Sequence, residues 1–123
     1  LATFANQPTD LQGRGIDLGK VELYWFYSTE DANITEFNIY TDNGTGIIDY
    51  VTSIGTVTRD VSINYQEKFF SFTSSTLTAL NETWKFVIRA GDGTYEDQNT
   101  EYISVELDGR TITAPVGSTV ENI

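Results

Sequence analysis

Oxygen-bearing side chains crowd one predicted loop in the last third of the chain. The candidate ligands there are Asp92, Glu96, Asp97 and Asn99. Carboxylate and amide oxygens are the ligands that Ca²⁺ takes in proteins, so these residues form a candidate calcium site. The stretch lacks the regular D-x-D-x-D-G spacing of a dedicated calcium loop, as does a second acidic turn at Asp42-Asn43. Ordinary turn chemistry, in which Asp and Asn cap backbone N–H groups, is the competing interpretation.

Catalysis is the other chemistry that acidic residues permit. Glu96 and Asp97 are adjacent, and glycoside hydrolysis needs only two carboxyl groups at a suitable separation. Neighbouring acids in a loop more often face solvent. The chain has no His and no Cys, which removes the usual general base, thiolate nucleophiles, Ser-His-Asp triads and cysteine-ligated metals. The sequence therefore predicts a protein that is not an enzyme.

The charge balance bears on the partners of the chain. Eighteen acidic residues against seven basic ones give a net charge of -11, which repels phosphate backbones and anionic membranes. No apolar run reaches the ~20 residues of a membrane-spanning helix. We expect neither nucleic-acid binding nor membrane insertion.

The chain begins at Leu1 and contains no Met, so we expect a processed product or a piece of a longer protein.

Tyrosines at predicted outward or loop positions suggest a glycan-binding alternative. The candidates are Tyr24, Tyr40, Tyr50 and Tyr95. Such rings stack on sugars in some proteins, but on a sheet face they more often cover their own strands. Glycan binding therefore stays open as an alternative.

Three N-x-T sequons fall in predicted loops or at strand ends. They begin at Asn33, Asn43 and Asn81. Sequons of this kind are compatible with glycosylation in an extracellular protein, and some are expected by chance in a chain rich in Asn and Thr.

Alternation of apolar and polar residues dominates the chain and predicts an all-β fold. After a first short strand around Leu11, the expected strands cover residues 21–25, 34–41, one or two segments within 47–58, 69–77, 83–90 and 101–107. Asn43-Gly44 is a strong turn signal, and Gly55 reads as a turn or bulge.

The strand alternation also predicts an outer wall of charged side chains. Lys85 and Arg89 share one face of their strand. Surface ion pairs contribute little to stability, so we expect this wall to be solvated and a charge reversal at Arg89 to cost little.

Several ordered motifs resemble a fibronectin type III domain. They are Pro8-Thr9-Asp10-Leu11, Val21-x-Leu23-x-Trp25, Phe37-Asn38-Ile39-Tyr40, the strand from Trp84 to Ala90, and an acidic Glu96-Asp97-x-Asn99 tract similar to that of many bacterial members. The resemblance covers residues 8–108 and implies a seven-stranded antiparallel immunoglobulin-like β-sandwich. The strand order that it implies would place Glu36, Asn38 and Glu106 on the strands beside Lys85 and Arg89. Trp84 stands where the family usually carries a tyrosine whose hydroxyl ties a corner to nearby backbone, and an indole can only donate a hydrogen bond.

These observations predict one domain with two flanks. We expect an extended N-terminal arm over residues 1–8, the fibronectin type III-like domain over 9–108, and a linker or tail over 109–123. The flanks could join neighbouring copies by adding strands to exposed sheet edges. The resemblance implies a structural or adhesive module of an extracellular, cell-surface, virion or filament assembly, whose partners are other subunits or domains. The alternative is a carbohydrate- or calcium-binding module accessory to a secreted protein.

Overall fold

The computed structural model describes residues 7–16, 19–27, 33–59, 68–77 and 82–107. Within them the chain forms seven strands and no α-helix. The strands are β1 (Thr9–Ile16), β2 (Lys20–Phe26), β3 (Glu36–Thr41), β4 (Gly55–Thr58), β5 (Phe69–Thr73), β6 (Thr83–Gly91) and β7 (Tyr102–Glu106). No helix in this part of the chain could cross a membrane. The six segments outside these ranges are not described, and they include residues 1–6 of the predicted arm and all of the predicted tail.

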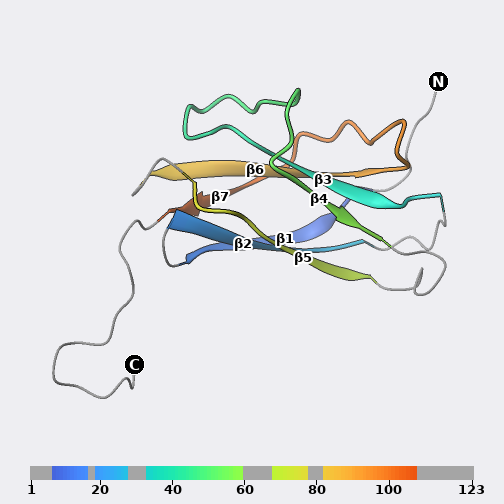
Figure 1. The fold of residues 1–123 in the computed structure, drawn as a ribbon, viewed down its shortest axis with the longest axis horizontal. Helices are drawn as coiled ribbons and strands as arrows, with labels where there is room; N and C mark the ends of the chain where they lie inside the picture. Colours follow the sequence, from blue (N-terminus) through green and yellow to red (C-terminus); the bar gives the residue numbers. More distant parts are fainter. Residues whose placement is uncertain (1–6, 17–18, 28–32, 60–67, 78–81, 108–123) are drawn as a thin grey trace, which may run out of the picture.

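The strands lie in two layers. One sheet has the order β1-β2-β5 and the other the order β4-β3-β6-β7, and every pairing is antiparallel. Figure 1 shows the two sheets stacked face to face, with the three-stranded sheet below the four-stranded one. The expected seven-stranded antiparallel sandwich is confirmed.

The core follows from strict alternation in the central strands. In β2, Val21, Leu23 and Trp25 are buried, while Tyr24 between them is exposed. Trp25 packs edge-on against Phe37 of the opposite sheet, with the ring centroids 5.5 Å apart. Phe37 in turn lies 4.5 Å from the ring of Phe70. Aromatic rings from both sheets thus fill the space between the layers, which explains how a domain without cysteines holds together.

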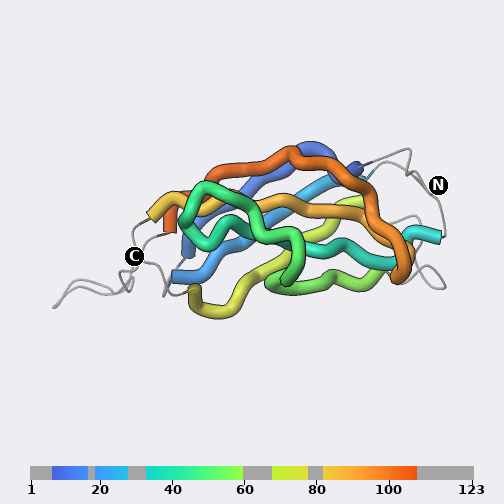
Figure 2. The backbone as a smooth tube through the Cα atoms, turned by 90° about the horizontal axis from the view of Figure 1, so that it is seen from above, coloured from blue at the N-terminus to red at the C-terminus, as the bar shows by residue number. Residues whose placement is uncertain are grey.

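The four-stranded sheet is covered on both faces. In β6, Trp84, Phe86 and Ile88 face the core as predicted, but Val87 and Arg89 on the opposite face are also buried. Figures 1 and 2 show why: the connections over residues 42–54 and 92–101 lie across the outer face of this sheet. The expectation of a solvated wall is therefore wrong at Arg89, because loops and not water cover it.

The outer strands of the two sheets meet along one side of the sandwich. Gly13 and Gly15 of β1 face Val105 and Glu106 of β7, and a Cβ atom at Gly15 would overlap the Glu106 carbonyl oxygen. Glycine is thus required for the two strands to approach so closely. Residues of increasing number lie opposite each other, so β1 and β7 run side by side in the same direction.

Two expected segments differ from the observed strands. Within residues 47–58 only β4 forms, together with an isolated bridge between Thr41 and Asp49. Gly55 begins β4 and is neither a turn nor a bulge; a Cβ there would overlap the ring of Phe72, which packs over it. β5 ends at Thr73, and the next residue, Ser74, accepts a hydrogen bond from the Val21 amide with its hydroxyl at 3.0 Å.

Candidate interaction site

A cluster of buried and half-buried polar side chains lies on the outer face of the four-stranded sheet, beneath the two covering connections. We call it the Arg89 cluster. Its members are Asn38 and Tyr40 of β3, Tyr50 of the 42–54 connection, Arg89 of β6 and Glu96 of the 92–101 connection. The register of β3 against β6 places Asn38 directly beside Arg89, which sets the geometry of the group. The neighbouring positions of Asn38 and Arg89 were predicted, but the contacts with Tyr50 and Glu96 and the burial of Arg89 and Tyr40 were not.

Arg89 is the centre of the cluster. Its Nε donates a hydrogen bond to the carbonyl oxygen of Asn99 at 2.9 Å. Its Nη1 lies 3.3 Å from a carboxylate oxygen of Glu96. The guanidinium also lies over the ring of Tyr50, 3.9 Å from the ring centroid. A cation that is desolvated over an aromatic face and paired with a carboxylate holds both covering connections against the sheet.

Glu96 completes the network from the other side. Its Oε1 accepts hydrogen bonds from the Tyr40 hydroxyl at 2.7 Å and from the Asn38 amide at 3.0 Å. Burial, and then the hydrogen bond to Glu96, raise the pKa of Tyr40 well above its ordinary range. Tyr40 therefore stays protonated as a donor, and its hydroxyl is engaged inside the protein.

The predicted calcium ligands have partners within the chain. Asp97 is buried, and its carboxylate accepts hydrogen bonds from the Ala90 amide at 2.7 Å and from the backbone and side-chain nitrogens of Asn99. The side chain of Asn99 also donates to the Ile88 carbonyl at 3.0 Å. These bonds fasten the loop along β6 and leave Asp97 and Asn99 turned toward the sheet.

Asp92 lies at the exposed tip of the same loop. Its Oδ1 accepts hydrogen bonds from the backbone amides of Thr94 and Tyr95, each at 2.8 Å. These two bonds lower the pKa of the Asp92 carboxyl, Tyr95 contributing most. No group of three or more Asp or Glu residues in the described part of the chain is arranged to hold a metal ion. Calcium binding by Asp92, Glu96, Asp97 and Asn99 stays a prediction.

Asp42 forms a second anchor that sequence reasoning treated only as an acidic turn. Its carboxylate is buried and accepts hydrogen bonds from the backbone amides of Gly44, Gly46 and Lys85 at 2.8, 2.9 and 3.0 Å. The turn needs left-handed backbone at Asn43, whose φ is 56°, and at the two glycines. Asp42 thus closes its own turn and fastens it to β6. The Asp-Asn-x-x-Gly spacing was the available signal for the turn, but not for the contact with Lys85.

Trp84 fills the position where the family tyrosine was expected. Its ring is buried and stacks on Phe86 with the centroids 6.4 Å apart. Its indole nitrogen has no hydrogen-bond partner in the structure and lies against Gly44. The packing role of the residue is present, and a hydrogen bond that ties the corner is not.

The exposed aromatic residues differ from the predicted set. Tyr40 is buried in the Arg89 cluster, so its assignment as an outward ring for sugars is wrong. Tyr24 and Tyr95 are 41% and 59% exposed, as predicted, and Tyr50 is partly buried. Tyr102 on β7, at 54%, is a further exposed ring that was not among the candidates for sugar stacking.

Two of the three sequons can be placed. Asn33 and Asn43 are both exposed, as an acceptor must be. Asn81 lies outside the described residues.

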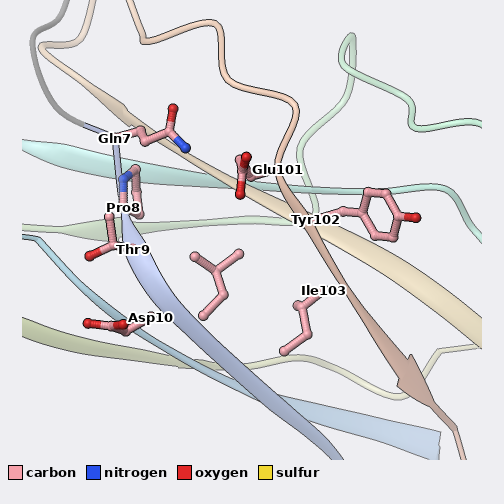
Figure 3. A pocket seen from close by; sticks show the side chains of 8 residues that line it. Gln7, Pro8, Thr9, Asp10, Glu101, Tyr102 and Ile103 are labelled. Carbon is pink, nitrogen blue, oxygen red and sulfur yellow. The ribbon is translucent and has the colours of Figure 1, made fainter.

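A recess of about 300 Å³ opens where β1 and β7 separate, beyond the glycines that bring them together. Figure 3 shows Gln7 and Glu101 at its rim, with Ile103 below them and the ring of Tyr102 directed away. Leu11 also lines it. The recess holds no cluster of acids or bases that would define a ligand, and sequence reasoning did not predict it.

Comparison with known proteins gives the fold. No protein-family model matches the chain, and no curated protein matches it in sequence. Among solved structures it is similar to the FN1-FN3 domains of chicken CNTN1, with a TM-score of 0.55 and 13% identity. The match covers 82% of this chain and 31% of that chain, so this protein spans less than a third of its structural neighbour. The chain has a fibronectin type III-like fold.

Proposed function

We propose that the chain is a non-enzymatic structural or adhesive module of an extracellular, cell-surface, virion or filament assembly, which spaces or joins protein subunits. The observation that carries this proposal is the use of its polar side chains. Four charged side chains that could otherwise bind a ligand or take part in catalysis each hold a loop to the four-stranded sheet. They are Arg89, Glu96, Asp97 and Asp42. Their chemistry serves the scaffold and is not offered to a substrate.

The path of the chain supports a spacing role. Because β1 and β7 run in the same direction, the described chain enters the sandwich at one end and leaves it at the opposite end (Figure 1). Modules with this path can follow one another in line without turning back. A series of such modules sets a fixed distance between the proteins at its two ends.

Size-exclusion chromatography with light scattering tests the assembly role. We would compare the whole chain with a chain that lacks residues 1–7 and 109–123. Association of both chains would assign the contact to the sandwich itself, and association of the whole chain alone would assign it to the flanks. Monomers in both cases, up to the highest attainable concentration, would contradict a role in self-assembly.

The proposed extracellular location has its own test. Asn33 and Asn43 are exposed, which supports glycosylation of their sequons if the chain passes through a secretory pathway. Intact-mass measurement of native material would show added glycan mass. An unmodified mass would leave location to be decided by surface labelling of intact cells or particles.

Glycan binding is the second candidate function. It is supported by three exposed rings, Tyr24, Tyr95 and Tyr102, which lie on different strands and loops. A glycan array would test it, and binding that is lost in a Tyr95→Ala variant but kept in Tyr24→Ala would locate the site. An array without hits would remove this alternative.

Calorimetric titration with CaCl₂ tests the calcium proposal in the same way: no heat and no shift in melting temperature would contradict it.

A further inference from the structure

Among the described strands, β5 ends the three-stranded sheet and pairs with β2 on one side only. Hydrogen bonds from the Tyr27 amide to the Lys68 carbonyl and from the Ser74 amide to the Val21 carbonyl fix which residues face β2. In an antiparallel pair these alternate along the strand. The backbone N–H and C=O groups of Phe69, Ser71 and Thr73 therefore point away from β2, toward the free edge. These three residues are exposed.

The other edges in the described structure carry features that hinder strand addition. β4 has four residues, and β1 is interrupted by a register shift between Thr9 and Gln12. The free side of β7 faces β1, and β7 ends in the charged residue Glu106. Short strands, bulges and charges are the means by which proteins block edge pairing, and β5, with the sequence FFSFT, has none of them.

The free edge of β5 is complementary to itself. If two copies meet antiparallel about a two-fold axis at Ser71, then Ser71 lies opposite Ser71 of the second copy and Phe69 lies opposite Thr73. All three positions carry outward N–H and C=O groups, so each pair can exchange two backbone hydrogen bonds. The same patch thus serves on both copies, as a symmetric dimer requires.

Charge and apolar exposure favour a second copy at this edge. The chain has a net charge of -11, yet β5 carries no charged residue, so two copies can meet here with little direct repulsion. Phe69 is 73% exposed and packs on Phe26 of β2, with the ring centroids 5.0 Å apart. Pairing would cover part of this exposed ring while extending the sheet.

We propose that β5 is a self-association edge, at which a second copy of the chain adds its own β5 in antiparallel register to form a continuous six-stranded sheet. This inference rests on the proposed assembly function and names the contact. The contact is small, which places it among weak, reversible interfaces, so association should appear at roughly 0.1–1 mM chain.

A single-cysteine cross-link tests the register. The chain has no Cys, so a Ser71→Cys variant has one thiol. The two Cα atoms of a hydrogen-bonded antiparallel pair lie about 5.5 Å apart, within the range that a disulfide spans. Under mild oxidation, this variant should form covalent dimer at least about tenfold faster than a matched Thr56→Cys variant, which places an exposed thiol on the outward side of β4. Equal rates for the two variants would overturn the proposal.

Sedimentation velocity on full-length chains tests the energetics. Ser71→Pro removes the central outward N–H, a change that an edge strand tolerates, and Ser71→Lys places two like charges opposite each other. Both should weaken dimerisation by at least about tenfold, while Thr56→Pro should not, and the far-UV circular dichroism of each variant shows whether it folds. Dimerisation unchanged in both Ser71 variants but lost on removing residues 1–7 and 109–123 would overturn the β5 contact while supporting the assembly function. A monomeric whole chain at 1 mM would overturn both.

Discussion

Replacing Arg89 with methionine would remove the guanidinium while leaving a flexible apolar side chain beneath the covering connections. The variant loses a charged hydrogen bond to the Asn99 carbonyl, worth about 1.5–3 kcal/mol, and a desolvated contact with the Tyr50 ring, worth about 2 kcal/mol. It also leaves Glu96, whose side chain is 20% exposed, without its cation. These contributions overlap, so we expect a total loss of about 3–5 kcal/mol in the free energy of unfolding.

Urea denaturation followed by tryptophan fluorescence would measure this loss, with thermal unfolding as a second readout. The matched control is Arg14→Met, because Arg14 forms an ion pair with Glu22 at 2.7 Å but its side chain is 69% exposed. That variant should shift the unfolding midpoint far less than Arg89→Met, because solvent screens an exposed ion pair. If Arg89→Met stayed within about 0.5 kcal/mol of the native chain, the cluster would not hold the connections, and the sequence-based expectation of a solvated Arg89 would have been the better one.

Three further changes probe other anchors. Because the pKa of Tyr40 is raised above its ordinary 10.0, its stabilising contribution is present below that pH and is lost as the pH rises above it; Tyr40→Phe should flatten this alkaline decline in chemical denaturation. Asp42→Ala leaves three backbone amides without their carboxylate partner and should cost about 2–4 kcal/mol in the same assay, whereas a loss below 0.5 kcal/mol would contradict the anchor. Gly15→Ala places a methyl group on the Glu106 carbonyl and should lower the melting temperature, corresponding to about 1–3 kcal/mol; an unchanged melting temperature would show that β1 and β7 can separate without cost.

The strands of the core were predictable because burial on one face imposes a period of two. Val21, Leu23 and Trp25 in β2, and Trp84, Phe86 and Ile88 in β6, all lie where the alternation placed them. The alternation is a local pattern, which the sequence carries directly. The neighbouring positions of Asn38 and Arg89 followed instead from the strand order that the family resemblance implies.

The cover over the outer face was not predictable in the same way. Alternation tells which residues leave the core, but not whether water or another segment meets them. Arg89 and Tyr40 lie on the outer face of their sheet, as the alternation predicts. Both are nevertheless buried, because the connections over residues 42–54 and 92–101 return across that face. Their return depends on contacts distant in sequence, such as the hydrogen bond from Tyr40 to Glu96. No periodic signal marks such contacts.

The loop of the predicted calcium ligands makes contacts that the sequence did not reveal. Asp92, Glu96, Asp97 and Asn99 lie together in this loop, as their spacing in the sequence indicates. Composition alone could not show that Asp97 accepts hydrogen bonds from the strand beside it, because that depends on how the loop folds back onto β6. Calcium binding by these residues stays a prediction.

The side-by-side course of β1 and β7 has a mechanical consequence. Tension applied to the two ends of the domain would pull β1 and β7 in opposite directions along their own axes. The hydrogen bonds that join β1 to β2 and β6 to β7 run across that direction, so the load falls on all of them together and not on one after another. Sliding would also force the close contact of Gly15 with Glu106 past its neighbours. The sandwich is therefore arranged to resist stretching in shear.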